Sequence, residues 1–465
     1  MASGDAIAPL IQLEAMNWSP DAVFYHLFPL GCLGAPERHP LEGPTTNRLL
    51  ELTNWIDHIE DLGANALLLG PIFESGSHGY DTADLMAIDR RLGDDASMAA
   101  VSRELHRRGI RLVFDGVFNH TGRDFWAFRD VRTHGQASRY RNWYHLDFNG
   151  SSPSGDPFHY KGWAGNYDLA KLNVSNPEVR DYLFAAVSSW IDRFDIDGLR
   201  IDAADAIDLD FLHRLAEHCH ARKPDFWLMG EVVHGDYRKW VDLGGLDCTT
   251  NYEAYKGLWS SHNDRNYFEI AYSLNRQFGP DGIYRGLHLY NFADNHDVER
   301  VASVLKEPAH LCPLYFLLMT MPGVPSIYYG SEWGIEGRKT KVTDAPLRPA
   351  LDPRTAAHDA PHPELYGLIK KLIALRQGHS ALRVGDYRQL QVTHEQFAFL
   401  RRDASESIVV AVNAAAHPAK LAFALPVSSD GRLVDLITED VSFEIAGGKC
   451  ALTVAPRQGR ILMVA

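Results

Sequence analysis

The 465 residues carry a formal net charge of −14 at pH 7, and 45% of them are hydrophobic, which is ordinary for a globular domain. The acidic balance argues against nucleic acid and anionic membranes as partners, since binding to either needs clustered positive charge. The N-terminus has no basic start followed by an apolar core, and no apolar run is long enough to span a bilayer, so we expect a cytoplasmic protein. Five scattered cysteines without a Cys-x-x-Cys pair predict reduced thiols.

Residues 1–20 form a predicted N-terminal arm, and strand and helix patterns alternate after it. The predicted strands are 22–30, 65–73, 111–118, 198–203, 226–233, 246–252, 289–297 and 325–331. Apolar residues at helical spacing separate several of them, as at 47–62, 98–108 and 177–194. Eight parallel strands with intervening helices close into a barrel whose functional site lies at the carboxyl ends of the strands.

Two segments depart from this alternation. Residues 121–174 are polar, rich in glycine and aromatic residues, and too long for an ordinary connection, so we predict an inserted loop domain that divides the barrel into 21–120 and 175–380. Residues 381–465 alternate apolar and polar positions between turn residues, which indicates antiparallel strands. The predicted fold is therefore α/β, a (β/α)8 TIM barrel with an inserted loop domain after the third strand and a C-terminal antiparallel β-sandwich.

The stretch Gly-Leu-Arg-Ile-Asp-Ala-Ala-Asp-Ala at 198–206 is the centre of the predicted site. In a strand, Arg200 and Asp202 point to the same face. The arginine favours the ionised form of the neighbouring carboxyl group, as a nucleophilic carboxylate requires. Alone, an Arg-x-Asp pair is more often a structural ion pair than a catalytic one.

Other strand ends carry polar residues that would meet at the same mouth of the barrel. Asp115 and His120 lie at the third strand, Glu231 at the fifth, and His296 and Asp297 at the seventh. Each histidine or carboxylate alone could be structural, but their joint placement predicts glycosidic cleavage. In that chemistry one carboxylate attacks the anomeric carbon and a second protonates the departing oxygen.

Four of these segments resemble the signature segments of the α-amylase family of glycoside hydrolases. They are Asp-Gly-Val-Phe-Asn-His at 115–120, Gly-Leu-Arg-Ile-Asp at 198–202, Gly-Glu-Val-Val at 230–233 and Phe-Ala-Asp-Asn-His-Asp at 292–297. Segments at 79–84, 169–173 and 321–332 support this resemblance, and the first two are similar to those of the cyclomaltodextrinase, neopullulanase and maltogenic amylase group. The resemblance covers roughly residues 20–465.

The resemblance implies a role for each matching residue. Asp202 would be the nucleophile, Glu231 the general acid and then base, and Asp297 the residue that holds the distorted sugar. The implied substrate-binding residues are Tyr80, Asp115, His120, Arg200, His296, Asp344 and Arg348. The implied activity is that of a retaining α-glucoside hydrolase on cyclic or branched malto-oligosaccharides with α-1,4 or α-1,6 linkages, and cyclic α-maltosyl-(1→6)-maltose is one candidate substrate.

Departures from the family pattern bear on metals and partners. We expect no required cofactor and no metal-ligating residues, because Ala-Ala-Asp-Ala at 203–206 lacks the family's usual calcium ligand, although Asn119 and nearby carbonyls are oxygens that would face a calcium ion. The group normally carries an extra β-domain before the barrel, whereas about 20 residues precede the first strand here. We therefore expect that any homodimer uses another surface.

Two alternative functions remain open at this stage. A transglycosylase would share every catalytic residue and differ only in how well a sugar competes with water. A non-catalytic, amylase-like subunit of an amino-acid transporter predicts loss of the acidic residues and a membrane-spanning segment, and the sequence shows neither.

Overall fold

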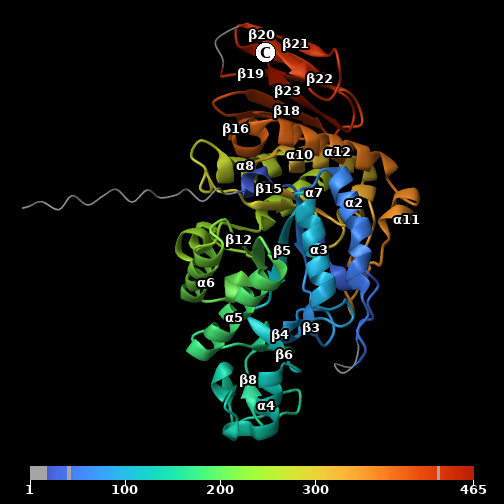
Figure 1. Ribbon diagram of the computed structural model, residues 1–465. Coiled ribbons are helices and arrows are strands. Elements are labelled where there is room, and N and C mark those ends of the chain that lie inside the picture. Colours follow the sequence, from blue (N-terminus) through green and yellow to red (C-terminus); the bar gives the residue numbers. More distant parts are fainter. Residues whose placement is uncertain (1–17, 39–42, 427–429) are drawn as a thin grey trace, which may run out of the picture.

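The computed structural model describes residues 18–38, 43–426 and 430–465, so most of the predicted arm 1–20 lies outside the described residues. The predicted parallel barrel is confirmed (Figure 1). Its strands are β1 Phe24–Leu27, β2 Ala66–Leu69, β5 Arg111–Gly116, β11 Gly198–Ile201, β12 Trp227–Gly230, β13 Cys248–Thr249, β14 Tyr290–Phe292 and β15 Val324–Tyr328. They are ordered β13-β12-β11-β5-β2-β1-β15-β14, and a parallel bridge between Thr250 and Tyr290 closes the ring.

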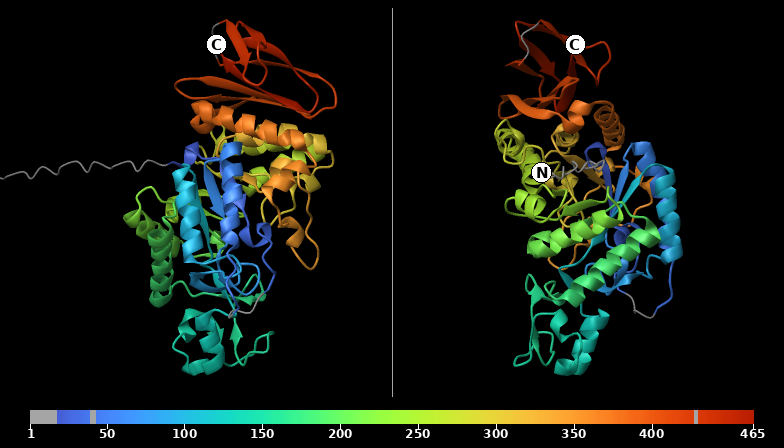
Figure 2. Two further views of the ribbon diagram at one scale, coloured as in Figure 1. Left: turned by 45° about the vertical axis from the view of Figure 1, so that its right-hand side comes forward. Right: turned by 60° about the vertical axis from the view of Figure 1, so that its left-hand side comes forward.

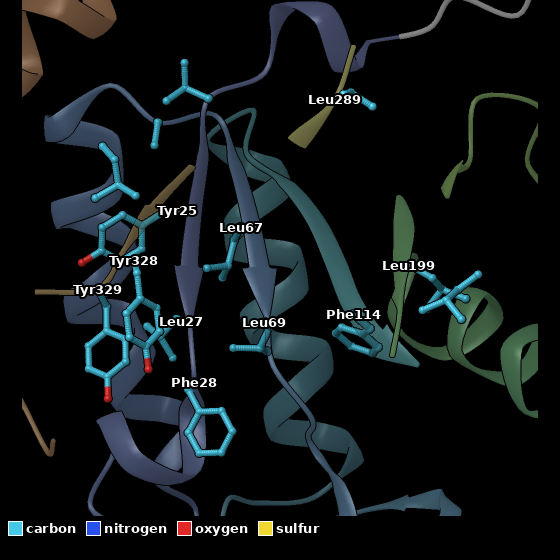
Figure 3. Packing of buried hydrophobic residues seen from close by; sticks show 14 of the residues in the cluster. Tyr25, Leu27, Phe28, Leu67, Leu69, Phe114, Leu199, Leu289, Tyr328 and Tyr329 are labelled. Atoms are coloured by element: carbon cyan, nitrogen blue, oxygen red, sulfur yellow. The ribbon is translucent and has the colours of Figure 1, made fainter. Parts of the chain in front are cut away.

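The strands alternate between two cores. Tyr25 and Leu27 of β1 and Leu67 and Leu69 of β2 pack outward against the helices (Figure 3). The residues that alternate with these along the strands, such as Phe24 and Leu68, face the barrel interior. There Phe24 stacks on Trp227 with ring centroids 4.9 Å apart. The two-residue period of a strand thus reserves one face for the helix layer and the other for the barrel core and the site above it.

The helix layer matches the sequence patterns closely. The main helices are α2 Leu52–Leu62, α3 Asp95–Arg107, α5 Pro177–Phe194, α6 Leu209–Arg222, α7 Tyr252–Asn263, α8 Phe268–Phe278, α10 Leu311–Thr320 and α12 Pro363–Gly378. In α5, the side chain of Asn176 accepts a hydrogen bond from the backbone N–H of Glu178, and Pro177 occupies the first turn. This cap fixes where α5 begins.

The strand predicted over residues 65–73 is shorter than expected. It ends at Leu69, and Phe73 instead opens a hairpin of β3 (Phe73–Ser75) and β4 (Thr82–Ile88). Pro71 lies between them, and its missing N–H cannot continue a ladder in a central strand. The hairpin turn carries Tyr80 to the mouth of the barrel.

The inserted segment folds over the carboxyl ends of the strands. It contains β6 His120–Gly122, α4 Trp126–His134, β7 Leu146–Asp147, β8 His159–Tyr160, β9 Gly162–Trp163 and β10 Asn166–Lys171. Strand β10 pairs with β6, directly after the third barrel strand, and with β9. Figures 1 and 2 show this segment at one end of the molecule and the C-terminal strands at the other.

The C-terminal strands form one antiparallel sheet in the order β16-β17-β18-β23-β20-β21-β22-β19. They are β16 Asp386–Val392, β17 Gln396–Arg402, β18 Ser407–Asn413, β19 Ala419–Ala424, β20 Gly431–Asp435, β21 Ser442–Ala446, β22 Lys449–Val454 and β23 Gln458–Val464. The sheet folds over its own core, which includes Val409, Leu421 and Leu452, and its other face joins the core of the barrel and helices. The predicted sandwich is confirmed.

A buried aspartate anchors the start of the strand that carries Arg200. Asp197 accepts hydrogen bonds from His106 at 2.8 Å and from the backbone N–H of Leu112 at 2.9 Å, and pairs with Lys223 at 2.9 Å. Burial alone would raise the pKa of Asp197, but these hydrogen bonds and the lysine charge lower it below its usual range. Asp197 therefore ties the amino ends of β5 and β11 together.

We predict that Asp197→Asn lowers the free energy of unfolding at pH 7 by about 3 kcal/mol, as breaking a buried ion pair typically does. Because folding lowers the pKa of Asp197, its contribution is complete above the unfolded value of about 4 and is lost as the pH falls toward the folded value. Urea unfolding at pH 7 and in acid should show the two proteins converging in acid. Asp195→Asn, which removes an exposed partner of the same lysine, is the control and should have little effect.

Candidate active site

Arg200 is the centre of the site. Its guanidinium group is buried and lies 2.6 Å from the carboxylate of Asp115, 2.8 Å from Glu231 Oε2 and 3.4 Å from Asp202 Oδ1. Backbone hydrogen bonds fix the two neighbouring acids, because the N–H of Asp202 donates to Gly116 and the N–H of Glu231 donates to Ile201. The residues predicted from three different strands therefore meet around one cation.

The effect of Arg200 on Asp202 is weaker than the sequence suggested. Burial and the nearby carboxylate of Glu231 raise the pKa of Asp202 well above its usual range, and Arg200 opposes this only in part. The physical reason is that Arg200 lies closer to Asp115 and Glu231 than to Asp202. In the ligand-free site Asp202 thus retains a proton to higher pH than an ordinary aspartate.

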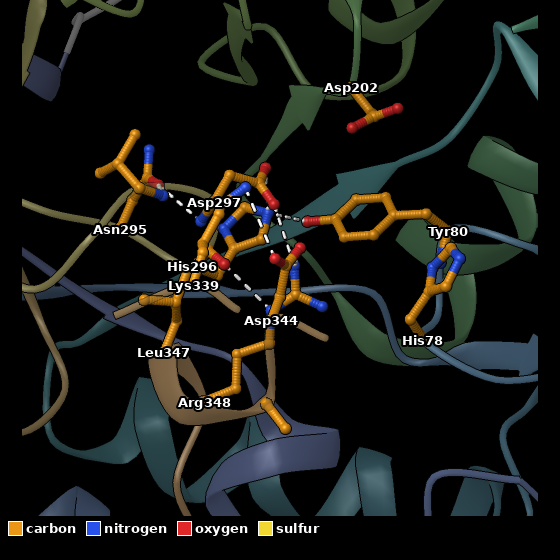
Figure 4. Close-up of polar contacts among 12 residues, drawn as sticks. His78, Tyr80, Asp202, Asn295, His296, Asp297, Lys339, Asp344, Leu347 and Arg348 are labelled. Carbon is orange, nitrogen blue, oxygen red and sulfur yellow. Dashed lines mark hydrogen bonds and ion pairs between the residues drawn. The ribbon is translucent and has the colours of Figure 1, made fainter. Parts of the chain in front are cut away.

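Asp297 lies across the site from Asp202, next to His296 (Figure 4). Its Oδ2 is 2.8 Å from His296 Nε2, and its Oδ1 accepts a hydrogen bond of 2.9 Å from Arg348. Burial would raise the pKa of Asp297, but His296, Arg348 and Arg200 together lower it below its usual range. Asp297 is therefore held ionised, and its side chain remains 35% exposed to a ligand.

Tyr80 connects the two halves of the site. Its hydroxyl group donates to Asp115 Oδ2 at 2.9 Å and contacts His296 Nε2. The rings of Tyr80 and His296 stack with centroids 5.3 Å apart. Figure 4 shows the hydroxyl end of Tyr80 pointing toward His296, with Asp202 above the tyrosine ring in this view. Tyr80 therefore presents an aromatic ring at the mouth of the barrel, held by Asp115 and His296.

His120 lies at the wall formed by the inserted segment. Burial and the positive charges of neighbours lower its pKa to about 3, so the ring is neutral. It stacks against Trp163 of β9 at 6.1 Å with nearly parallel planes. The sequence showed Trp163 only as one of many aromatic residues in the insertion, and its pairing with β10 is what places it beside the site.

The ammonium group of Lys171, from β10, lies beside Asn119, the residue whose oxygen would face a calcium ion. Its ammonium group contacts Asn119 Oδ1 and donates to the carbonyl of Ala206 at 2.9 Å. A cation that already lies against both oxygens does not fit beside a calcium ion. Within residues 18–38, 43–426 and 430–465, no group of three or more His, Cys, Asp or Glu side chains is arranged to hold a metal.

Asp344 and Arg348 pair at 3.6 Å, and Arg348 also contacts Asp297. They line a cavity of about 670 Å³ that also includes Phe28, His78 and Val342. Arg348 covers the ring of Phe28 at 4.5 Å from its centroid. The cavity therefore extends the site from Arg348, and segments that follow three barrel strands, β1, β2 and β15, line it.

Comparison with known proteins identifies the family. The protein-family model described as "Alpha amylase, catalytic domain" matches residues 48–360, and the one described as "Maltogenic Amylase, C-terminal domain" matches residues 387–461. The chain belongs to the α-amylase family. It is a glycoside hydrolase of this family, and the four acidic segments that carried the resemblance lie where its catalytic domain matches.

The chain is also similar to individual members of this family, in sequence and in structure. A cyclomaltodextrinase of Geobacillus thermopakistaniensis (strain MAS1) is 32% identical over 91% of this chain and 74% of its own length. The ligand-free cyclic α-maltosyl-(1→6)-maltose hydrolase of Arthrobacter globiformis superposes with a TM-score of 0.80 at 28% identity, covering 97% of this chain and 100% of that one. The debranching enzyme of Nostoc punctiforme has a TM-score of 0.82 at 29% identity, with the same coverage.

The α-amylase family site contains one contact that the sequence did not indicate. Tyr252, the first residue of α7, donates from its hydroxyl group to Glu231 Oε1 at 3.3 Å, and Asn295 donates to the same hydroxyl group at 3.4 Å. The sequence analysis placed Tyr252 at the end of the predicted strand 246–252, whereas β13 ends at Thr249 and Tyr252 begins α7 at the carboxyl end of the barrel. In the part of the chain that the structure describes, no helix is long and apolar enough to cross a membrane.

We predict that the acidic limb of kcat/KM lies well above the ordinary aspartate pKa of about 4. Since the pKa of Asp202 is raised, the ionised nucleophile disappears, and activity falls, at a higher pH than for a free aspartate. Arg200→Gln should move the limb further upward, because it removes the charge that opposes the shift.

The measurement is a pH profile of kcat/KM for the wild type, for Arg200→Gln and for a control variant. Arg180→Gln, which removes a surface arginine paired with Asp210, is the matched control and should leave the limb in place. A limb at or below pH 4 in the wild type would contradict the prediction.

Proposed function

We propose that this α-amylase family enzyme is a retaining hydrolase of short cyclic or branched malto-oligosaccharides, with cyclic α-maltosyl-(1→6)-maltose as a candidate substrate that yields maltose. The observation that carries the proposal is the meeting of Asp202, Glu231 and Asp115 around Arg200, with Asp297 joined to Asp115 through His296 and Tyr80. The similarity to a cyclomaltodextrinase and to a cyclic maltosyl-maltose hydrolase supports the substrate class.

The two steps of retention need two carboxyl groups in different states. Asp202 attacks the anomeric carbon as a carboxylate, and Glu231 protonates the departing oxygen and then removes a proton from water. The close contact of Arg200 with both acids suits this exchange, because one cation stabilises whichever carboxylate is ionised. Ionised Asp297 holds sugar hydroxyl groups as positive charge develops on the ring.

The remaining polar residues bind the sugar without reacting. Tyr80 stacks beneath the ring at the point of cleavage, and the neutral His120 and the tethered His296 offer hydrogen bonds to its hydroxyl groups. Asp344 and Arg348 hold the next sugar toward the 670 Å³ cavity. Neutral hydrogen-bonding groups around an aromatic face suit an uncharged carbohydrate better than an ionic ligand.

We further propose that the enzyme needs no calcium, since Lys171 supplies the cation between Asn119 and Ala206. A cytoplasmic location and a homodimer formed through a surface other than a leading β-domain both stay predictions. Cell fractionation and light scattering on the purified protein would test them.

The test of the proposed function is hydrolysis of a substrate panel by the purified enzyme. We expect cyclomaltodextrins, pullulan, panose or cyclic α-maltosyl-(1→6)-maltose to be cleaved faster than starch, and proton NMR to show the α-anomer of the product first. Asp202→Asn should lose several orders of magnitude in kcat, because no other group at the site replaces the nucleophile.

Three outcomes would contradict it. A strong preference for starch would remove the substrate class, and an initial β-anomer would remove the retaining mechanism. Longer or re-linked products as the main outcome at high sugar concentration would identify a transglycosylase instead. Asp210→Asn, an aspartate on the surface of α6, is the control for Asp202→Asn.

For calcium, we predict that EDTA and added Ca²⁺ leave both activity and Tm of the wild type unchanged. Lys171→Ala should lower Tm and kcat, because it removes the link from β10 to the loops after β5 and β11. Lys161→Ala removes an exposed lysine near the same strand and serves as the control. Inactivation of the wild type by EDTA would show that a metal, not Lys171, holds these loops.

A further inference from the structure

His26 is a buried histidine at the top of the barrel core that the mechanism above does not use. It comes from β1, is 3% exposed, and its ring meets the ring of His296 edge-on with centroids 5.2 Å apart and planes at 80°. Among the described residues, His26 Nε2 and His296 Nδ1 both lack a hydrogen-bond partner. Two unpartnered nitrogens on facing buried rings need an explanation, because leaving a buried polar atom unpaired is costly.

The contacts of His296 fix which of its nitrogens carries a proton. Its Nε2 faces Asp297 Oδ2 and the oxygen of Tyr80, and the tyrosine proton is already donated to Asp115. Both neighbours of Nε2 are therefore acceptors, so the proton is on Nε2. Nδ1, on the other side of the buried ring, is then the nitrogen that still needs a hydrogen-bond partner.

We propose that His26 Nε2 is that partner, through one ordered water molecule between the two rings, and that it positions His296 for catalysis. His26 would hold the imidazole of His296 in the orientation and tautomer that present Nε2–H to Asp297 and to the sugar. It is a positioning residue, because it acts through His296 and does not touch the substrate. This inference rests on the proposed hydrolase function.

The surroundings of His26 keep it suited to this role. Burial and the positive charges of His296, Arg200 and Arg300 lower the pKa of His26 well below its usual range, and Asp297 opposes them only in part. A neutral imidazole has one donor nitrogen and one acceptor nitrogen. Phe28 and Tyr80 stack on His296 with near-parallel planes, at 5.6 Å and 5.3 Å, so the ring has fixed faces and His26 meets its edge.

Replacing His26 should therefore change catalysis in a specific way. We expect His26→Phe to lower kcat about tenfold, the loss of one hydrogen bond at the transition state, with a smaller change in KM. It should also change the acidic limb of kcat/KM by adding the protonation of Asp297 to that of Asp202, because a displaced His296 no longer lowers the pKa of Asp297. His26→Gln, which offers an amide donor, should recover most of both effects.

The experiment measures kcat, KM, the pH profile and Tm for the wild type, His26→Phe, His26→Met and His26→Gln. His262→Phe is the matched control, since His262 is equally buried but its hydrogen bonds go to Leu258 and Tyr267. It should alter Tm without moving the pH profile. Equal kcat and an unchanged limb in the apolar variants, or equal losses in His26→Gln and His26→Phe, would overturn the inference.

A high-resolution crystal structure of the wild type tests the contact even if the apolar variants fail to fold. An ordered water within hydrogen-bond distance of both His26 Nε2 and His296 Nδ1 would support it, and a Nδ1 that faces only carbon atoms would overturn it. If the wild type hydrolyses no α-glucan, the proposed function fails, whereas this structure still decides the contact between the two histidines.

Discussion

The site depends on the charge balance around one buried arginine. Moving a guanidinium group out of water is unfavourable by several kcal/mol unless carboxylates and hydrogen bonds surround it. Arg200 meets this requirement with Asp115 at 2.6 Å and Glu231 at 2.8 Å, and the more distant Asp202 is left with a raised pKa. The same contacts that make the arginine tolerable in the barrel therefore set how the acids share protons.

The barrel makes this cluster possible because neighbouring parallel strands hold their residues in register. Arg200 of β11 pairs with Asp115 of β5 on one side and with Met229 of β12 on the other. Inward side chains at one level of the barrel then face each other across its axis. Acids more than a hundred residues apart in sequence become neighbours without any long side chain having to reach.

The sequence predicted the features that depend on local patterns. Strand ends at Asp115, Arg200 and Glu231 were found because each follows a short apolar run, and the barrel, insertion and sandwich followed from the order of such runs. The hairpin from Phe73 to Ile88 was missed because its first apolar residues continue the run of β2, and only Pro71 marks the break.

The contacts that the sequence did not predict join residues from separate segments. Lys171 reaches a carbonyl 35 residues away, and Tyr252 reaches Glu231 from the start of a helix. His26 lies on the first strand and His296 after the seventh. No spacing rule connects such positions, because their proximity is a property of the closed barrel and not of any one element.

The resulting electrostatics favour positive charge at the reacting carbon. Asp115, Asp202, Glu231 and Asp297 face two guanidinium groups, those of Arg200 and Arg348. Even with Glu231 carrying the proton that it donates, the excess of carboxylates over arginines favours an oxocarbenium-like transition state over a neutral sugar. Because backbone and ring contacts already hold these groups, little reorganisation is needed when that charge develops. The arrangement of fixed dipoles and charges, and not the strength of any single contact, is then what distinguishes the transition state from the bound oligosaccharide.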